Sequence, residues 1–157
     1  MIKSVITPCL WFDHQAEQAA NFYISVFKNS TIDHISHYGK EGFEIHGQQE
    51  GTVMGIRFRL DGQPFSAING GPIFRFNEAI SFQVYCDTQE EIDYYWNKLT
   101  AQGEEVQCGW LKDQFGVSWQ VVPTILEELL NDSSRADRVT KAFLQMKKFD
   151  IAKLKSA

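Results

Sequence analysis

The sequence predicts an α+β fold in which two βαβββ modules form one cupped mixed sheet, followed by C-terminal helices. Two observations lead to this fold class. The order strand, helix, several strands occurs twice along the chain, and short motifs recur in the second copy: Leu10-Trp11-Phe12-Asp13 matches Val84-Tyr85-Cys86-Asp87, and Asn21-Phe22-Tyr23 matches Asp93-Tyr94-Tyr95. Such repetition indicates an internal duplication. Because each sheet alone leaves one face uncovered, two modules are expected to curl around a shared hollow with their helices outside.

The first module is predicted over residues 3–70. Its expected elements are a strand over 5–12, a helix over 16–27, and strands over 31–38, 53–60 and 63–68. Apolar residues at helical spacing mark the helix, and Asp61-Gly62 is a hairpin turn signal. The polar stretch 39–51 predicts a long loop, and Asn69-Gly70-Gly71-Pro72 ends the module.

The second module is predicted over residues 79–123, within a single domain over 1–131. Its expected elements are a strand over 80–86, a helix that Gly103 ends, and strands over 104–111 and 117–122. Thr88 and Glu91 form a capping box that opens the helix, and Thr124 and Glu127 predict a second box. The C-terminal extension, 132–157, is expected to hold a last helix that starts at Ser134 and buries Val139, Ala142, Phe143 and Met146; Phe149 is expected on the same helix.

The stretch from Trp110 to Pro123 carries the most specific pattern. Alternate residues of a strand share a face, so Ser118, Gln120 and Val122 are expected on one side and Trp119 and Val121 on the other. The turn before this strand is expected at Phe115-Gly116. Asp113 is expected either at the mouth of a pocket, with Trp110, or as the cap of this turn, and the cap is the favoured role. A polar side chain on a rigid strand can give a pocket its specificity, so Gln120 is interpreted as a metal ligand, a substrate contact or a core amide.

Composition narrows the classes of function. The net charge of −5 argues against non-specific nucleic-acid binding, which requires clustered cations. No apolar run approaches the ~18 residues of a membrane span, and no signal peptide is apparent. Three cysteines without CxxC spacing fit a reducing cytoplasm. The 12 Phe, 5 Tyr and 4 Trp suggest a core or cavity walled by rings.

The chain resembles the vicinal oxygen chelate superfamily, which contains glyoxalase I, bleomycin-resistance proteins and extradiol dioxygenases. Within it the sequence is similar to the PhnB-like branch, often labelled 3-demethylubiquinone-9 3-methyltransferase. The residues that carry the resemblance are Thr7-Pro8-Cys9-Leu10-Trp11-Phe12, Ala19-Ala20-Asn21-Phe22-Tyr23, Asn69-Gly70-Gly71-Pro72 with Phe74 and Phe76, Ala79-Ile80-Ser81-Phe82, and the stretch 110–123.

The resemblance implies where a metal would sit. In catalytic members His, Glu or Gln side chains hold a divalent ion in the cup, and alignment places those positions near Thr7, Asn69, Ser81 and Gln120. Hydroxyl groups are poor ligands for Zn, Ni or Fe. We therefore expect no metal and no other cofactor.

The first hypothesis is a metal-free protein that binds a small molecule, as bleomycin-resistance relatives do, and that forms a homodimer as superfamily members often do. The predicted pocket residues are Cys9, Trp11, Asn69, Ser81, Gln83, Tyr85, Trp110, Ser118 and Gln120. The second hypothesis is a metal-dependent lyase, isomerase or dioxygenase. The third is a methyltransferase, which lacks support because the Gly70-Gly71 pair is followed by Pro72 and by no helix. No catalytic residue is assigned.

Overall fold

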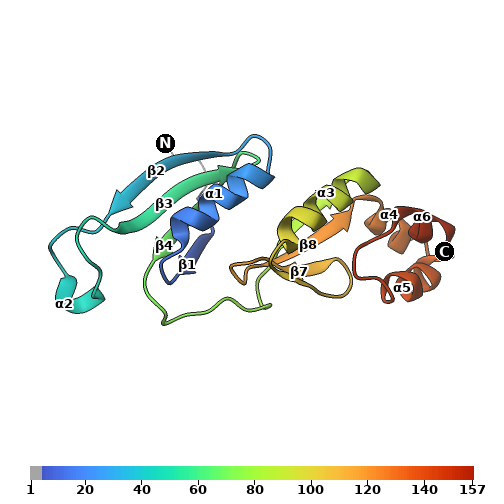
Figure 1. Ribbon diagram of the computed structural model, residues 1–157. Coiled ribbons are helices and arrows are strands. Elements are labelled where there is room, and N and C mark those ends of the chain that lie inside the picture. The colour runs from blue at the N-terminus through green and yellow to red at the C-terminus, as the bar shows by residue number, and fades with distance from the viewer. Residues whose placement is uncertain (1–4) are drawn as a thin grey trace. The chain divides into compact units, whose positions relative to one another are not determined.

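The computed structural model describes residues 5–157, so the module start predicted at residue 3 and the domain start predicted at residue 1 lie outside the described residues. The chain divides into two compact units, the first ending at Arg75 and the second spanning Phe76–Ala157. This boundary falls between the two predicted modules. Each unit contains a four-stranded mixed sheet and a helix against it, which confirms the α+β fold class and the βαβββ order (Figure 1).

The first unit is built on the strand order β1-β4-β3-β2. Its elements are β1 Cys9–Phe12, α1 Ala16–Val26, β2 Thr31–His37, α2 Phe43–His46, β3 Val53–Leu60 and β4 Gln63–Asn69. Strand β1 runs parallel to β4, and the other pairs are antiparallel. Helix α1 lies along one face of this sheet (Figure 1), and its small and aromatic residues Ala19, Ala20 and Tyr23 are buried there. The opposite face of the sheet is the open face of the first unit.

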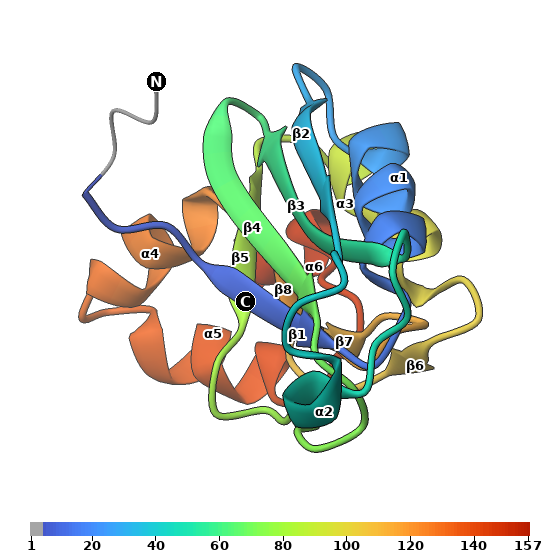
Figure 2. The ribbon, with the colours of Figure 1, turned by 90° about the vertical axis from the view of Figure 1, so that its left-hand side faces the viewer.

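The loop over 39–51 was predicted without secondary structure, and the structure corrects this with the short helix α2. Figure 2 shows α2 in the connection between β2 and β3. Gly42 and Gly47 flank the helix with φ of 84° and 68°, values that glycine adopts without steric cost. The ring of His46 lies 4.6 Å from that of Tyr38, centroid to centroid, and helps to hold the helix against the strand end.

The second unit repeats the pattern with the order β5-β8-β7-β6. Its elements are β5 Phe82–Cys86, α3 Gln89–Thr100, β6 Glu104–Glu105, β7 Trp110–Lys112, β8 Ser118–Pro123, α4 Ile125–Asn131, α5 Ala136–Phe143 and α6 Ile151–Ser156. Strand β5 runs parallel to β8 as β1 does to β4. Helix α3 covers the face that carries Trp119 and Val121, and the other face is the open face of the second unit.

Three local predictions in the second unit are corrected. The strand expected over 104–111 is split into β6 and β7, because Cys108 and Gly109 both adopt positive φ between them. Thr124 does not cap α4 through its side chain; its hydroxyl donates to Asp87 instead, at 2.7 Å. The expected single last helix is two helices, because a new cap forms at Asp150, whose carboxylate accepts from Lys153 N.

The segment between α5 and α6 is attached to the second unit through the loop before β7. Cys108 N donates to Met146 O at 2.8 Å, and Gly109 N donates to Lys147 O at 2.7 Å. The Phe149 ring is 2% exposed and lies so close to Gly109 that a Cβ there would be 2.4 Å from it. We call residues 146–149 with the loop Cys108–Gly109 the C-terminal clamp. No helix in the described part of the chain is long and apolar enough to cross a membrane.

Candidate functional site

The open face of the second unit brings together most of the predicted pocket residues. Gln83 and Tyr85 on β5 share this face with Gln120 and Val122 on β8, away from α3. In the register of the sheet Gln83 pairs with Gln120, and Trp110 on β7 pairs with Gln120 from the other side. Trp110, Gln120 and Gln83 therefore form one row across three strands.

A chain of hydrogen bonds crosses this row. Tyr85 Oη donates to Gln83 Oε1 at 2.9 Å, and Gln83 Nε2 makes a long contact of 3.5 Å with Gln120 Oε1. Gln120 Nε2 in turn donates to Ser81 Oγ at 2.8 Å. Both ends of the Gln120 amide are thus engaged by neutral groups, and Tyr85, at 61% exposure, presents its ring to solvent.

Ser118 extends the same face beyond Gln120. Its side chain is buried, with 2% exposure, and its Oγ has no hydrogen-bond partner among the described residues. Lys112, its register partner on β7, forms an ion pair with Glu78. The hydrogen bond from that ammonium group lowers the pKa of Glu78. A buried hydroxyl without a partner is unusual, and no sequence pattern signals it.

The turn before β8 is organised by Asp113, which agrees with the capping role, the favoured of its two predicted roles. The carboxylate is buried, and its Oδ1 accepts from Phe115 N at 2.8 Å and Val117 N at 3.1 Å. Its Oδ2 accepts from Trp119 Nε1 at 2.8 Å. Gly116 completes the turn with φ of 86°. Asp113 is therefore a structural residue that fixes the start of β8, and through it the position of the row.

Cys9 and Trp11 lie on the open face of the first unit. Cys9 is exposed. Trp11 is held at the end of the sheet: its Nε1 donates to Gly71 O at 2.9 Å, and its ring meets Phe74 edge to face at 4.9 Å. A Cβ at Gly70 would lie 2.0 Å from the Trp11 ring. The glycine pair thus forms the chain break predicted after the first module, and Gly70 leaves room for the Trp11 ring.

The structure places Asn69 elsewhere. Its side chain lies on the helix-covered face and is buried; Oδ1 accepts from Ala16 N at 2.9 Å, and Nδ2 donates to Val53 O at 3.1 Å. With both groups engaged, Asn69 anchors the start of α1 and does not join the open face. This corrects its assignment to the pocket and to the metal positions.

The correspondence of the two sheets shows which residue of the first unit occupies the open-face position that was assigned to Asn69. The motif match of the first and second modules equates Cys9 with Gln83. Cys9 pairs with Ser66, and Gln83 pairs with Gln120. Ser66, three residues before Asn69, is therefore the counterpart of Gln120. Sequence spacing alone could not find this, because it requires the strand register.

The remaining thiols and histidines offer no nucleophile or ligand cluster in the described residues. Burial, with the charges of Glu91 and Asp87, raises the pKa of Cys86 to about 12, so this thiol stays protonated near neutral pH. Cys108 Sγ contacts Phe143 O at 3.7 Å. Within residues 5–157, no three His, Cys, Asp or Glu side chains are grouped so that they could hold a metal ion.

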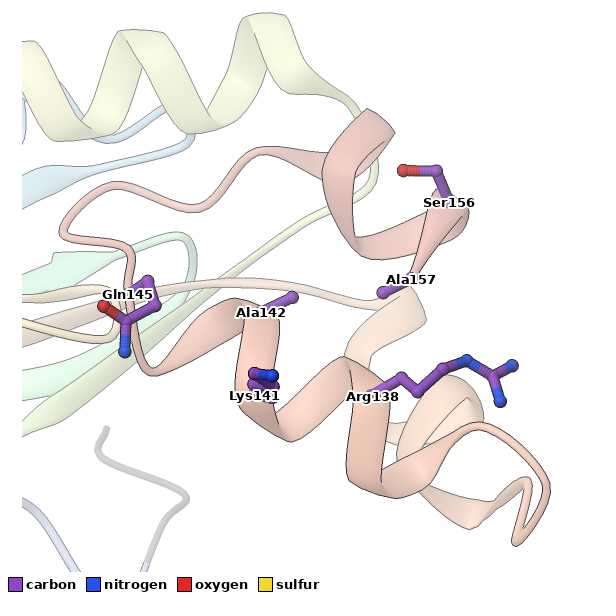
Figure 3. A pocket seen from close by; sticks show the side chains of 6 residues that line it. All are labelled: Arg138, Lys141, Ala142, Gln145, Ser156 and Ala157. Carbon is purple, nitrogen blue, oxygen red and sulfur yellow. The ribbon is translucent and has the colours of Figure 1, made fainter.

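A further groove, not predicted, lies on the C-terminal helices. Figure 3 shows the side chains that line it, from α5, the turn after it, the last residue of α6 and the residue that follows: Arg138, Lys141, Ala142, Gln145, Ser156 and Ala157. The groove is shallow and open, and Arg138 extends away from the helix. It contains none of the predicted pocket residues.

The fold of two βαβββ units is that of the glyoxalase superfamily, and comparison with known proteins agrees. The family model described as 3-demethylubiquinone-9 3-methyltransferase matches residues 4–122. The chain therefore belongs to this family, the PhnB-like branch of the vicinal oxygen chelate superfamily. The model ends before α4, so the three C-terminal helices lie outside it. No curated protein matches the chain.

Solved structures extend the comparison. A putative 3-demethylubiquinone-9 3-methyltransferase, PhnB protein, from Bacillus cereus is 38% identical over 77% of this chain and 100% of that chain, with a TM-score of 0.68. Protein PA1353 from Pseudomonas aeruginosa is 19% identical over 75% and 96% of the two chains, with a TM-score of 0.59. The fosfomycin resistance protein FosX from Listeria monocytogenes, complexed with Mn(II) and sulfate, is 19% identical over 83% and 98%, with a TM-score of 0.52. The last two share the fold alone.

Proposed function

We propose that this protein binds a small, partly apolar molecule without covalent chemistry on the open face of its second unit, and that it needs no metal to do so. The observation that carries the proposal is the row of Trp110, Gln120 and Gln83 with its chain of neutral hydrogen bonds. A ring beside a few polar groups on rigid strands is typical of small-molecule sites.

The orphan hydroxyl supports the same proposal. An unsatisfied buried polar group costs roughly 1–3 kcal/mol, and Ser118 Oγ carries such a cost on this face. The assignment of Cys9 and Trp11 to a pocket stays a prediction that concerns the first unit by itself, and the homodimer stays part of the proposal.

The metal-dependent alternative has a specific objection in the donor set. Gln120 supplies a single neutral amide oxygen, its nitrogen donates to Ser81, and the other predicted position on this unit, Ser81, offers only a hydroxyl, which is a poor ligand for Zn, Ni or Fe. Asn69, the other amide at a predicted metal position, is committed to the start of α1. The residues present do not fit a divalent ion, and no chemistry is derived through one.

Methyl transfer also lacks a supporting site. The Gly70-Gly71 pair packs against Trp11 and leads into no helix, whereas a cofactor loop would place backbone amides at a helix start. Titration with S-adenosylmethionine by calorimetry tests this directly. Binding at micromolar or lower Kd would overturn the proposal in favour of the family's label.

The main test uses anilinonaphthalene sulfonate, a fluorescent probe with rings and one polar head. We expect saturable binding at one probe per chain, unchanged by EDTA, and weakened about fivefold or more in Gln120→Ala and Trp110→Ala through loss of polar and ring contacts. Gln18→Ala, on the exposed surface of α1, is the matched control and should bind as the wild type does.

Two results would contradict the proposal. One is stoichiometric Mn, Zn, Ni or Fe in the purified protein that Gln120→Ala removes, which would favour the enzyme. The other is probe binding that neither Gln120→Ala nor Trp110→Ala weakens, which would place the probe elsewhere.

A further inference from the structure

The row on the second unit has a counterpart on the first. Gln83 and Gln120 correspond to Cys9 and Ser66, and the next strand adds Trp110 in the second unit and Arg57 in the first, because Arg57 pairs with Ser66 as Trp110 pairs with Gln120. The internal duplication therefore places Arg57, Ser66 and Cys9 where the proposed site of the second unit has its ring and its amides.

The longer sheet of the first unit extends this row by one residue. His34 on β2 pairs with Arg57, so His34, Arg57, Ser66 and Cys9 lie abreast on β2, β3, β4 and β1. Three of them are exposed and Ser66 is half-buried. The buried neighbours Ile56, Phe58 and Ala67 point to the helix side, so the row belongs to the open face of this unit.

The two arginines of β3 differ in their partners. Arg59 Nε donates to Asp33 Oδ2 at 2.9 Å, and Asp33 Oδ1 accepts from Thr31. Arg57, two residues away on the same face, forms no ion pair or hydrogen bond with any side chain of the described residues, and its neighbour in the row is His34. The single nearby carboxylate of β2 is thus already occupied, and Arg57 presents an unpaired cation within a chain whose net charge is −5.

We propose that the open face of the first unit binds a small oxyanion, a carboxylate or a phosphate-type group, with the Arg57 guanidinium as its principal partner. The planar fork of arginine matches two oxygens of such an anion. Neighbouring strands are ~4.8 Å apart, so Ser66 and His34 flank the bound group within hydrogen-bonding reach of their side chains. The Ser66 hydroxyl makes only a long contact of 3.4 Å with Pro8 O and can turn to the anion.

The test is a titration followed by NMR of the whole chain labelled with ¹⁵N. Inorganic phosphate and acetate are added separately, each against sodium chloride at the same ionic strength. We expect saturable shifts of the Arg57 Nε–H signal and of the amides of His34 and Ser66. Arg57→Gln should weaken anion binding about tenfold. The affinity of Arg57→Lys should lie between those of the wild type and Arg57→Gln, because lysine keeps the charge but lacks the planar guanidinium that matches two oxygens.

Arg59→Gln is the matched control, since it removes an equal charge from the same strand and face. If the Arg59→Gln variant binds the anion within about twofold of the wild-type affinity, the site is at Arg57. A loss as large as that of Arg57→Gln would mean that the anion responds to the overall positive charge of the strand. Shifts that do not saturate, that chloride reproduces, or that Arg57→Gln leaves unchanged would overturn the proposal. Saturation by phosphate but not acetate assigns the phosphate class, and the reverse assigns carboxylates. Because the readout lies on the first unit, the result is independent of the site proposed on the second.

Discussion

The two modules have the same strand order but fix the start of their helices differently. Helix α1 has no side-chain cap at Gln15; instead Asn69, from the end of β4, accepts from Ala16 N across 53 positions of sequence. Helix α3 is capped locally, with Thr88 and Glu91 satisfying one another's backbone donors. The two copies of a duplicated fold can therefore keep the same geometry with different helix caps. One helix is capped by a residue distant in the sequence, and the other by a local capping box.

The modules differ again at their outer hairpins. Strands β2 and β3 pair over most of their length, whereas β6 and β7 have two and three residues. The C-terminal clamp supports this short hairpin, because Met146 O and Lys147 O accept the amides of Cys108 and Gly109 that no neighbouring strand pairs. The second unit thus relies on a C-terminal segment, between α5 and α6, that lies outside the family model.

The largest effect is expected from Phe149→Ala, which removes the buried ring of the clamp. The lost burial and the cavity should lower the free energy of unfolding by about 3–5 kcal/mol, measured by urea denaturation. Hydrogen exchange should show the loss in the second unit, at the amides of Cys108 and Gly109. Leu144→Ala, at a side chain 54% exposed, is the control and should change little. A loss spread evenly over both units would argue against a clamp specific to the second.

Asn69→Ala should give the next largest effect, this time in the first unit. It leaves Ala16 N and Val53 O without their partners, and we expect a loss of about 2–3 kcal/mol. Asn69→Asp keeps the acceptor for Ala16 N and should therefore recover part of the lost free energy of unfolding. Hydrogen exchange at the first turn of α1 reports the anchor directly. If Asn69→Ala leaves that turn protected, the long-range cap is not what holds the helix.

The features that the sequence predicted are local, and those that it missed depend on contacts between distant residues. The Thr88 box, the Asp61-Gly62 turn and the Asp113 turn involve residues within a few positions of each other, so their patterns are visible in the sequence. The two positive φ values at Asp61 and Gly62 confirm the hairpin. The alternation of β8 also follows from strand geometry alone.

The roles of Asn69, Ser118 and Arg57 were not visible in the same way. An alignment by strand ends assigns Asn69 to the pocket, but it does not show that the Asn69 side chain faces α1, where it accepts from Ala16 N. Two further features depend on residues tens of positions away: the lack of a hydrogen-bond partner for Ser118 Oγ among residues 5–157, and the row through Arg57. The second capping box failed for the same reason, since Asp87, far along the chain, takes the Thr124 hydroxyl.

A pair of threonines tests this distinction between a true cap and a mere pattern. Thr88→Ala should lower the free energy of unfolding by about 1 kcal/mol, because Glu91 N loses its acceptor. Thr124→Ala, with the same sequence motif, should lower it by less than about 0.5 kcal/mol, since only an exposed hydrogen bond to Asp87 is lost. Equal losses in the two variants would mean that the motif acts at both helices.

The smallest effect is expected from the ion pair that ties the clamp to α3. Lys148 Nζ lies 2.6 Å from Asp93 Oδ1, and the hydrogen bond from Lys148, with a second from Gln89, lowers the pKa of Asp93 below its ordinary value of 3.8. A lowered carboxyl pKa contributes stability that is present above the unfolded value and lost as the pH falls through the folded one. Both side chains are more than a third exposed, so solvent screening limits the contribution to less than about 1 kcal/mol.

Asp93→Asn should therefore lower the Tm slightly at neutral pH and converge with the wild type as the pH falls below about 3.8. Added salt should shrink the neutral-pH difference, because it screens an exposed pair. Glu90→Gln, an exposed acid one turn earlier on the same helix, controls for the change in net charge. A difference in Tm that persists undiminished in acid would show that Asp93 acts through packing. The clamp would then owe its attachment to Phe149, to the backbone bonds and to Gln89 Nε2, which donates to Phe149 O.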